Sequence, residues 1–261
     1  MRTKLGRALV VLGMQAVFLA SVATAEPPLT SPYHFEMLEG QGVEVCEACL
    51  KAFEAIAWGP DEVGLSGCER NYDSTYGLSA PQWTELQPLK HLPLLKQVML
   101  FLIPPDPEAH IGHGRSSMYE GTIFESDETF RQNIEIELKN KRIGIAQSQA
   151  DIDNDGHPEP LFTYRIDYCA NPQAPAPTRV LFVLTPDRQS IDMTKTDLVT
   201  QNELKTEEDP GGDFSGRMYG VFFFKGQTYF DKYDRDPYPD IVTVYQAKGK
   251  RVSSLCKFRY E

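Results

Sequence analysis

The sequence lacks the short motifs that mark the common classes of enzyme. It contains no G-x-S-x-G elbow, no H-E-x-x-H zinc motif, no P-loop and no glycine-rich dinucleotide turn. Basic residues are also few, with 26 Lys and Arg against 37 Asp and Glu. Because binding to a polyanion requires clusters of Lys and Arg, this balance excludes nucleic acid as a partner. The one short basic run, at 139–142, is expected to end a helix.

Long hydrophobic runs are missing after the first 25 residues. Residues 1–25 have the pattern of a signal peptide, in which three basic residues precede an apolar segment at 8–22 and an Ala-Thr-Ala cleavage site. The apolar segment is too short to span a membrane comfortably, and no second one follows. Removal of this segment takes away three positive charges, so the net charge changes from −11 to −14. We therefore expect an exported, periplasmic or extracellular protein whose partner is another protein or an envelope component.

Cysteine is scarce, and all five residues follow the predicted signal peptide: Cys46, Cys49, Cys68, Cys169 and Cys256. In an oxidising compartment we expect disulfide bonds, and an odd number leaves one thiol free or available to join chains. We predict a Cys46–Cys68 bond that fastens the first helix to the following loop, with Cys49 as a small core residue. A second bond is predicted between Cys169 and Cys256.

A zinc or redox centre is the alternative interpretation of the same region. Cys46 and Cys49 form a C-x-x-C pair, and His110 and His113 form an H-x-x-H pair. Two cysteines and two histidines can bind zinc, and a C-x-x-C pair can also carry thioredoxin-like redox chemistry. The chain would then be an exported hydrolase or a zinc or redox protein. Against this, no βαβ pattern surrounds the cysteines, and export favours disulfides over thiolate metal sites.

The pattern of apolar residues divides the remaining chain into three parts. Residues 26–42 contain three prolines and are predicted to be an extended, partly disordered lead-in. Residues 43–141 form a predicted helical region, because apolar residues recur there at helical spacing. The expected helices are 43–58, 83–103 and 127–141, and prolines at 88 and 93 are expected to break the early part of the second.

From residue 142 to residue 261 the apolar period changes to that of β-strands. Single strands are predicted at 142–148, 161–168 and 179–185. Two hairpins are predicted around Lys-Gly turns, at 219–230 and at 241–258. The expected fold class is therefore α+β, with a helical N-terminal part followed by an antiparallel β-sheet part.

A strongly acidic segment lies between the first two predicted strands. Residues 151–159 read Asp-Ile-Asp-Asn-Asp-Gly-His-Pro-Glu, with carboxylates at alternate positions before a glycine. Calcium is bound by oxygen ligands at such spacing, and only a cation readily relieves repulsion among three aspartates. The predicted calcium ligands are the side chains of Asp151, Asp153, Asp155 and Glu159 and the backbone carbonyl of His157. The simpler alternative is a polar hairpin, since Asp-Gly is a favoured two-residue turn.

The acidic segment differs from an EF-hand. A helix–loop–helix site places its bidentate Glu at position 12, where this chain has Phe162, and the segment leads into a strand. It resembles the loops of FG-GAP/VCBS, integrin-type repeats, with the pattern D-x-D-x-D-G-x-x-D/E. Over residues 45–70 and 150–168 the chain is also similar to secreted bacterial proteins with an early Val-Cys helix and one such loop. This resemblance implies a calcium loop between strands and implies no activity.

A second acidic segment, Asp234–Asp240, repeats the first at a constant offset of 81 residues. In the repeat, Lys232 stands where the first copy has Asp151, and Pro237 stands where it has Gly156. Proline cannot adopt the positive φ that a sharp glycine turn uses, and the lysine places an ammonium beside the site. We expect this degenerate copy to be structural, with weak or no metal binding. The sequence as a whole predicts an exported, calcium-binding and non-enzymatic binding or structural module.

Overall fold

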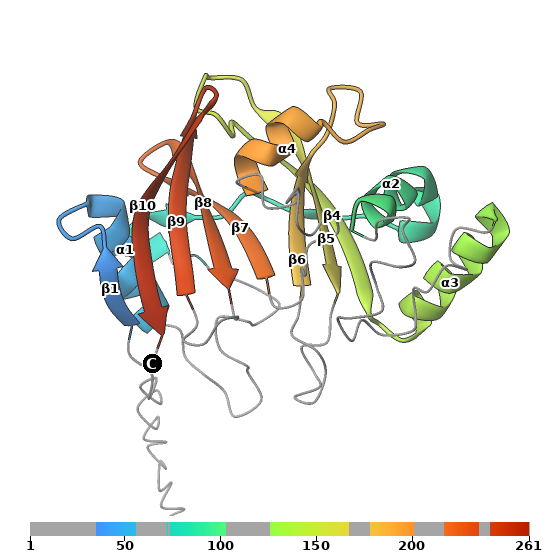
Figure 1. Cartoon of the computed structure of the whole chain (residues 1–261), viewed down its shortest axis with the longest axis horizontal. Helices are drawn as coiled ribbons and strands as arrows, with labels where there is room; N and C mark the ends of the chain where they lie inside the picture. Colours follow the sequence, from blue (N-terminus) through green and yellow to red (C-terminus); the bar gives the residue numbers. More distant parts are fainter. Residues whose placement is uncertain are drawn as a thin grey trace, which may run out of the picture.

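The computed structural model describes residues 35–55, 72, 74–102, 126–166, 178–200, 217–234 and 241–260. Within these ranges the chain forms ten strands and four α-helices (Figure 1). The helices are α1 (Glu44–Glu54), α2 (Leu92–Leu102), α3 (Asp127–Lys139) and α4 (Met193–Thr200). The strands are β1 (Phe35–Glu39), β2 (Leu78–Ser79), β3 (Thr84–Glu85), β4 (Ile143–Ala150), β5 (Glu159–Ile166), β6 (Thr178–Val183), β7 (Arg217–Phe224), β8 (Gln227–Asp234), β9 (Ile241–Lys248) and β10 (Arg251–Tyr260).

All the strands belong to one sheet. Its order is β1-β10-β9-β8-β7-β6-β5-β4-β3, and β2 pairs with β7 outside this path. Neighbouring strands are antiparallel except β6 and β7, which meet in parallel at Arg179 and Met218. Figure 1 shows the sheet running from β1 beside α1 to β4 near α2 and α3. Two antiparallel groups of strands are therefore joined at a single parallel seam.

The mixture of helices and antiparallel strands agrees with the predicted fold class, but the strands do not begin only at residue 142. Strand β1 lies in the predicted lead-in and pairs with β10, the last strand of the sheet. Strands β2 and β3 lie in the predicted helical region and pair with β7 and β4. The prediction missed them because a two-residue strand is too short to show alternation of apolar and polar residues.

Most of the longer elements were predicted correctly. Helix α3 begins after Ser126, whose side chain accepts a hydrogen bond from the backbone N–H of Thr129 at 3.0 Å. Helix α2 is shorter than predicted, because β3 and a 3₁₀ turn at Pro88–Lys90 occupy the residues before it. Both predicted hairpins are present as β7–β8 and β9–β10. Helix α4 was not predicted, because polar and apolar residues are mixed along its sequence without a clear helical spacing.

In the described part of the chain, three clusters of buried side chains form the core. The first joins α1 to β7, β8, β9 and β10, and the second joins α2 and α3 to β4, β5 and β6. The third contains alternate residues of the same strands: on β5, Leu161 belongs to the third cluster, whereas Phe162 and Tyr164 belong to the second. The third cluster also contains Ile152 from the acidic segment and Val199 from α4. The acidic segment is therefore anchored in the core.

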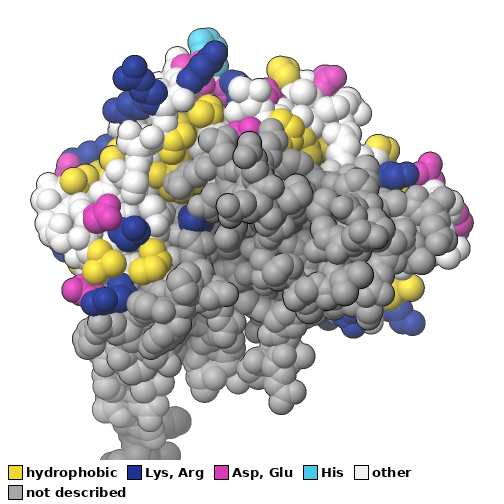
Figure 2. Space-filling model, viewed as in Figure 1, with side chains coloured by type: hydrophobic (Ala, Val, Ile, Leu, Met, Phe, Trp, Pro, Cys, Tyr) yellow, Lys and Arg dark blue, Asp and Glu magenta, His cyan; other side chains and the backbone are white. Residues whose placement is uncertain are grey.

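Charged side chains of both signs are mixed on the visible surface. On the face drawn in Figure 2, Lys and Arg side chains lie near Asp and Glu side chains. Among the described residues, no helix is long and apolar enough to cross a membrane.

The predicted disulfide bonds were wrong. Cys46 of α1 is bonded to Cys256 of β10, with the two Cα atoms 5.6 Å apart. This bond excludes both Cys46–Cys68 and Cys169–Cys256; Cys68 and Cys169 lie outside the described residues. Cys49 is a free, buried thiol, as predicted, and burial raises its pKa to about 12. Proximity in sequence favoured Cys68, but the packing of α1 against the C-terminal strand decides the partner.

Two glycines before α1 provide a test of this packing. Gly40 and Gly42 both have positive φ, at +99° and +79°. A Cβ on Gly40 would lie 2.6 Å from the carbonyl oxygen of Leu255 and 2.7 Å from Sγ of Cys46, whereas a Cβ on Gly42 would meet nothing within 4 Å. We expect Gly42→Ala to lower the free energy of unfolding by about 1–2 kcal/mol.

Gly40→Ala should cost at least about 1 kcal/mol more than Gly42→Ala, because it adds overpacking to the same backbone strain. Urea denaturation of both variants measures the difference. Equal losses in the two variants would contradict the close packing of residue 40 against β10.

Candidate metal centre

The acidic segment closes the hairpin between β4 and β5. The ladder of these strands pairs Ala150 with Glu159, so the ends of the segment are held side by side. Ile152 is fully buried in the third core cluster and fastens the segment to the sheet. Gly156 has a φ of +95°, which allows the chain to turn back toward β5. The local fold therefore follows from one buried aliphatic residue, one glycine and the strand register.

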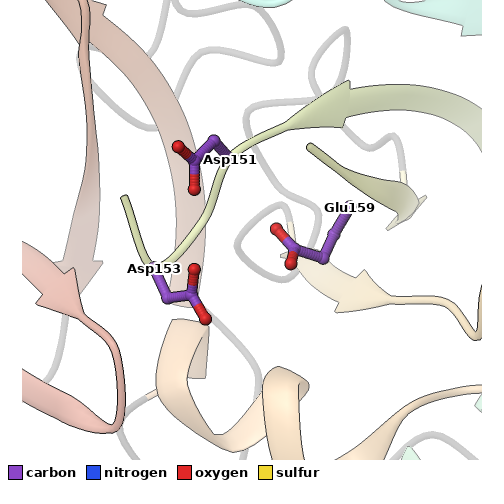
Figure 3. A group of neighbouring side chains, drawn as sticks. All are labelled: Asp151, Asp153 and Glu159. Carbon is purple, nitrogen blue, oxygen red and sulfur yellow. The ribbon is translucent and has the colours of Figure 1, made fainter. Parts of the chain in front are cut away.

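Three of the acidic side chains converge (Figure 3). One carboxylate oxygen from each of Asp151, Asp153 and Glu159 lies within 4.8 Å of the others. We call these three residues the acidic cluster. Glu159 is buried, with 7% of its surface exposed, and the two aspartates are partly buried. Three carboxylates this close repel one another unless positive charge lies among them.

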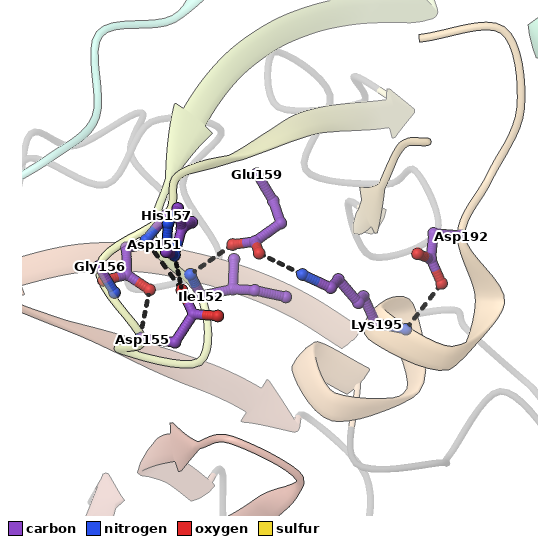
Figure 4. Close-up of polar contacts among 8 residues, drawn as sticks. All are labelled: Asp151, Ile152, Asp155, Gly156, His157, Glu159, Asp192 and Lys195. Atoms are coloured by element: carbon purple, nitrogen blue, oxygen red, sulfur yellow. Dashed lines mark hydrogen bonds and ion pairs between the residues drawn. The ribbon is translucent and has the colours of Figure 1, made fainter. Parts of the chain in front are cut away.

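Backbone N–H groups hold two of these carboxylates in place. Asp151 accepts hydrogen bonds from the N–H of Asp155 at 2.9 Å and of Gly156 at 2.8 Å. Glu159 accepts one from the N–H of Ile152 at 3.0 Å with its Oε2 atom. These bonds, most of which are drawn in Figure 4, orient the two acids without neutralising them.

Asp153 is the exception. Its Oδ1 atom is buried and has no hydrogen-bond partner among the described residues. Burial raises the pKa of Asp153 above its usual value, and the carboxylates of Glu159, Asp155 and Asp151 raise it further, while Lys195 opposes them. A buried acceptor without a partner is costly in a folded protein. Asp153 is therefore the member of the acidic cluster that most needs a positive ligand.

Lys195 of α4 supplies the only ammonium that contacts the acidic cluster among the described residues. Its Nζ atom forms a hydrogen-bonded ion pair with Oε1 of Glu159 (Figure 4). The hydrogen bond to Glu159 raises the pKa of Lys195, and the charges of Asp153 and Asp155 raise it further. Asp192 accepts a hydrogen bond from the backbone N–H of Lys195 at 3.1 Å, which orients the first turn of α4.

Asn154 fastens the acidic segment to β8 and β9, which belong to the other antiparallel group of strands. Its φ is +55°, a left-handed conformation that Asn tolerates better than most residues. Its side chain accepts a hydrogen bond from the N–H of Thr228 at 2.8 Å and donates one to the carbonyl of Ala247 at 2.9 Å. In addition, the N–H of Gly249 donates to the carbonyl of Asp153 at 2.9 Å. The segment therefore bridges from β4 and β5 to β8, β9 and the turn before β10.

The structure brings together three of the four predicted carboxylate ligands, Asp151, Asp153 and Glu159. Asp155 is outside the acidic cluster; it accepts a hydrogen bond from the backbone N–H of His157 at 2.8 Å, which lowers its pKa. The side chain of His157 is 87% exposed and lies beside Asp155. The backbone carbonyl of His157 stays a predicted ligand. Lys195 was not predicted from the sequence as the counter-ion of Glu159, nor was Asn154 predicted as the residue that fastens the segment to β8 and β9. A buried acid requires a counter-ion, but nothing in the sequence shows that it comes from residue 195.

The sequence suggests two other candidate sites, the cysteine–histidine site and the second acidic segment. A zinc or redox site that needs the thiols of both Cys46 and Cys49 cannot form while Cys46 is bonded to Cys256. His110 and His113 lie outside the described residues.

In the second acidic segment only Asp234 is described, at the end of β8. Lys232 lies inside that strand, paired with Thr243, and is buried. Lys232 therefore lies within a strand, whereas Asp151 follows the end of β4, because β8 extends three residues beyond the point that matches the end of β4.

Comparison with known proteins provides no family for this chain. No family model matches it, and no curated protein or solved structure is significantly similar to it. The resemblance of the acidic segment to FG-GAP/VCBS loops therefore stays a prediction.

Proposed function

We propose that this protein binds a divalent cation, Ca²⁺, at the acidic cluster, and that it is an exported, non-enzymatic binding or structural module. The observation that carries the proposal is the convergence of three carboxylates around the partnerless oxygen of Asp153. A cation placed among Asp151, Asp153 and Glu159 would relieve both their mutual repulsion and the missing contact.

The chemistry of the donors favours calcium over transition metals. All three converging side chains offer oxygen, and no cysteine or histidine of the described part of the chain belongs to the group. Hard cations prefer such ligands, and Ca²⁺ accepts irregular shells of six to eight oxygens that water and backbone carbonyls can complete. Mg²⁺ fits less well, because it requires a nearly ideal octahedron.

The charge of the site also suits a divalent ion. Three carboxylates and the ammonium of Lys195 together carry a net charge of −2 when all are ionised. A divalent cation would neutralise this charge without requiring Lys195 to leave. Lys195 would then hold one oxygen of Glu159, and the ion would take the remaining ligand positions on the aspartates.

The expected role of the ion is structural. Asn154 and the carbonyl of Asp153 attach the acidic segment to β8 and to the turn before β10. An ion that fixes this segment would therefore stabilise contacts between distant strands of the sheet. Such an ion holds the fold together rather than switching it between two states.

Thermal unfolding in Ca²⁺ and in EGTA tests the proposal. A ligand that binds only the folded state at 100 times its Kd stabilises it by about 2.7 kcal/mol. For a chain of this size we expect the melting temperature to rise by about 5–10 °C in Ca²⁺. Calorimetric titration should give about one bound ion per chain. An unchanged melting temperature together with no heat of binding would refute the calcium site.

Asp153 and Asp155 form a matched pair of variants. Asp153→Asn should abolish the calcium-dependent shift, because this side chain lies in the acidic cluster, whereas Asp155→Asn should retain it. In EGTA, Asp153→Asn should raise the melting temperature slightly, since the amide removes a charge that burial disfavours. Loss of the shift in Asp155→Asn, with retention in Asp153→Asn, would favour the ligand set predicted from sequence over the cluster in the structure.

A further inference from the structure

A polar groove lies at the corner of the sheet where β3 and β4 meet the turn after β6. Its volume is about 330 Å³, and it is lined by Gln82, Thr84, Gln147, Ser148, Gln149 and Arg188. A volume of this order is at the lower end of the range for small-ligand sites. Among the described residues, no aliphatic or aromatic side chain lines the groove. A ligand held there must therefore be polar over most of its surface.

The three glutamine side chains of the groove retain unused hydrogen-bonding capacity. Gln41, Gln97, Gln132, Gln189, Gln227 and Gln246 all hydrogen-bond to other groups of the protein. The side-chain amides of Gln82, Gln147 and Gln149 all line this groove, and they make no hydrogen bond to any described group. Gln147 and Gln149 are two residues apart on β4 and project from the same face, and Thr84 pairs with Gln147. The groove thus offers several amide donors and acceptors side by side.

Arg188 contributes the single positive charge among the described residues of the groove, and its backbone is held by hydrogen bonds. Its φ of +60° is left-handed, and its N–H donates to the carbonyl of Thr185 at 2.7 Å. Asp187 and Ser190 complete the hydrogen bonds of this turn through the hydroxyl of Thr185. Gln97 of α2 joins the turn to the helix, since its amide donates to the carbonyl of Gln189 at 3.2 Å and accepts from the N–H of Ile191 at 3.3 Å. These contacts fix the backbone from which the Arg188 side chain extends.

We propose that this groove binds a sugar that carries a carboxylate, a uronic acid residue of an acidic saccharide. Adjacent glutamine amides can each donate to and accept from neighbouring sugar hydroxyls. The guanidinium of Arg188 matches the planar carboxylate with two parallel hydrogen bonds. The polar lining excludes apolar ligands. Because the groove offers one cation among neutral amides, the group bound there should carry a single negative charge rather than several.

The groove is separate from the acidic cluster. Gln147 pairs with Phe162, and both lie on the side of the sheet that packs against α2. Glu159 pairs with Ala150, which belongs to the third cluster on the opposite side of the same hairpin. Sugar binding can therefore be measured with the calcium site empty, and its failure would leave the calcium proposal untouched.

The test is a titration of the full mature chain with D-glucuronate, followed by calorimetry and by two-dimensional ¹H–¹⁵N NMR of side-chain amides. D-glucose, inorganic phosphate and acetate are the comparison ligands, and every titration is run in EGTA and again in Ca²⁺. We expect glucuronate to shift the amide signals of Gln82, Gln147 and Gln149. Glucose and acetate should bind at least about tenfold more weakly, because each lacks one half of the recognised chemistry.

Arg188→Gln should reduce the affinity for glucuronate by about tenfold or more and make it equal to the affinity for glucose. Lys141→Gln is the matched control, because Lys141 is also an exposed basic residue with left-handed φ, at +54°, outside the groove. It should leave binding unchanged. Absence of amide shifts at about 20 mM glucuronate, equal binding of phosphate or acetate, or equal losses in the two variants would each overturn the proposal.

Discussion

Replacing Lys195 by methionine should be among the most damaging single changes in this protein. The ammonium of Lys195 is the counter-ion of Glu159, whose side chain is only 8% exposed. Removing one partner of a buried pair leaves an uncompensated charge and costs about 3–5 kcal/mol. Because the Lys195 side chain is itself 33% exposed, we expect about 3 kcal/mol, which corresponds to a fall of about 6–12 °C in melting temperature in EGTA.

Lys96→Met is the matched control for this change. Lys96 has the same side-chain exposure, 33%, and pairs with Asp127 at 2.6 Å, but the side chain of Asp127 is 93% exposed. An exposed ion pair contributes about 0–1 kcal/mol. The two variants therefore differ mainly in whether the abandoned carboxylate is buried. Equal losses of stability, measured by urea denaturation, would show that Glu159 does not depend on Lys195.

Calcium should restore part of the stability that Lys195→Met loses. Without the ammonium, the acidic cluster carries three negative charges, and a bound cation becomes the only nearby compensation. The calcium-dependent rise in melting temperature should therefore be larger in Lys195→Met than in the natural chain. If the variant is destabilised but calcium restores nothing, the ion pair is structural and the cluster does not bind calcium.

Loss of the disulfide should have an effect of similar size. The bond between Cys46 and Cys256 joins residues 210 positions apart, so it restricts nearly the whole unfolded chain. In the chain-entropy account, loops of this length bring stabilisation to the upper end of the usual range, about 4 kcal/mol. The double variant Cys46→Ala, Cys256→Ala should therefore melt about 8–16 °C lower.

A reductant provides the control for the disulfide. Dithiothreitol should lower the melting temperature of the natural chain to that of the double variant and leave the double variant unchanged. Peptide mapping should recover Cys46 joined to Cys256, with Cys49 unmodified until the protein unfolds, because this thiol is buried. A recovered Cys46–Cys68 pair, with Cys256→Ala as stable as the natural chain, would contradict the structure.

Local patterns in the sequence were sufficient for the elements whose signals lie within a few residues. Helix α3 could be predicted from its apolar spacing, and the β7–β8 and β9–β10 hairpins from alternation around a Lys-Gly turn. The closeness of Asp151, Asp153 and Glu159 was predictable for the same reason, since one hairpin contains all three. These features depend on backbone geometry over short distances, which the residues themselves impose.

Features that depend on distant contacts could not be predicted in this way. Strand β1 exists because β10 lies beside it, although Phe35 and its partner Tyr260 are 225 positions apart in the chain. The partner of Cys46 is decided by the packing of α1 on β10, and the counter-ion of Glu159 by the docking of α4 beside the β4–β5 hairpin.

The acidic segment combines both kinds of information. Its alternating aspartates, its glycine and its position between two strands were determined by the sequence alone, because turn chemistry and strand register are local. Only the tertiary structure decided that Asp155 lies outside the cluster, that Asp153 is left without a partner, and that Lys195 neutralises Glu159. The reason is physical: burial and electrostatic interaction depend on which groups meet in space, and those groups come from segments far apart in the chain.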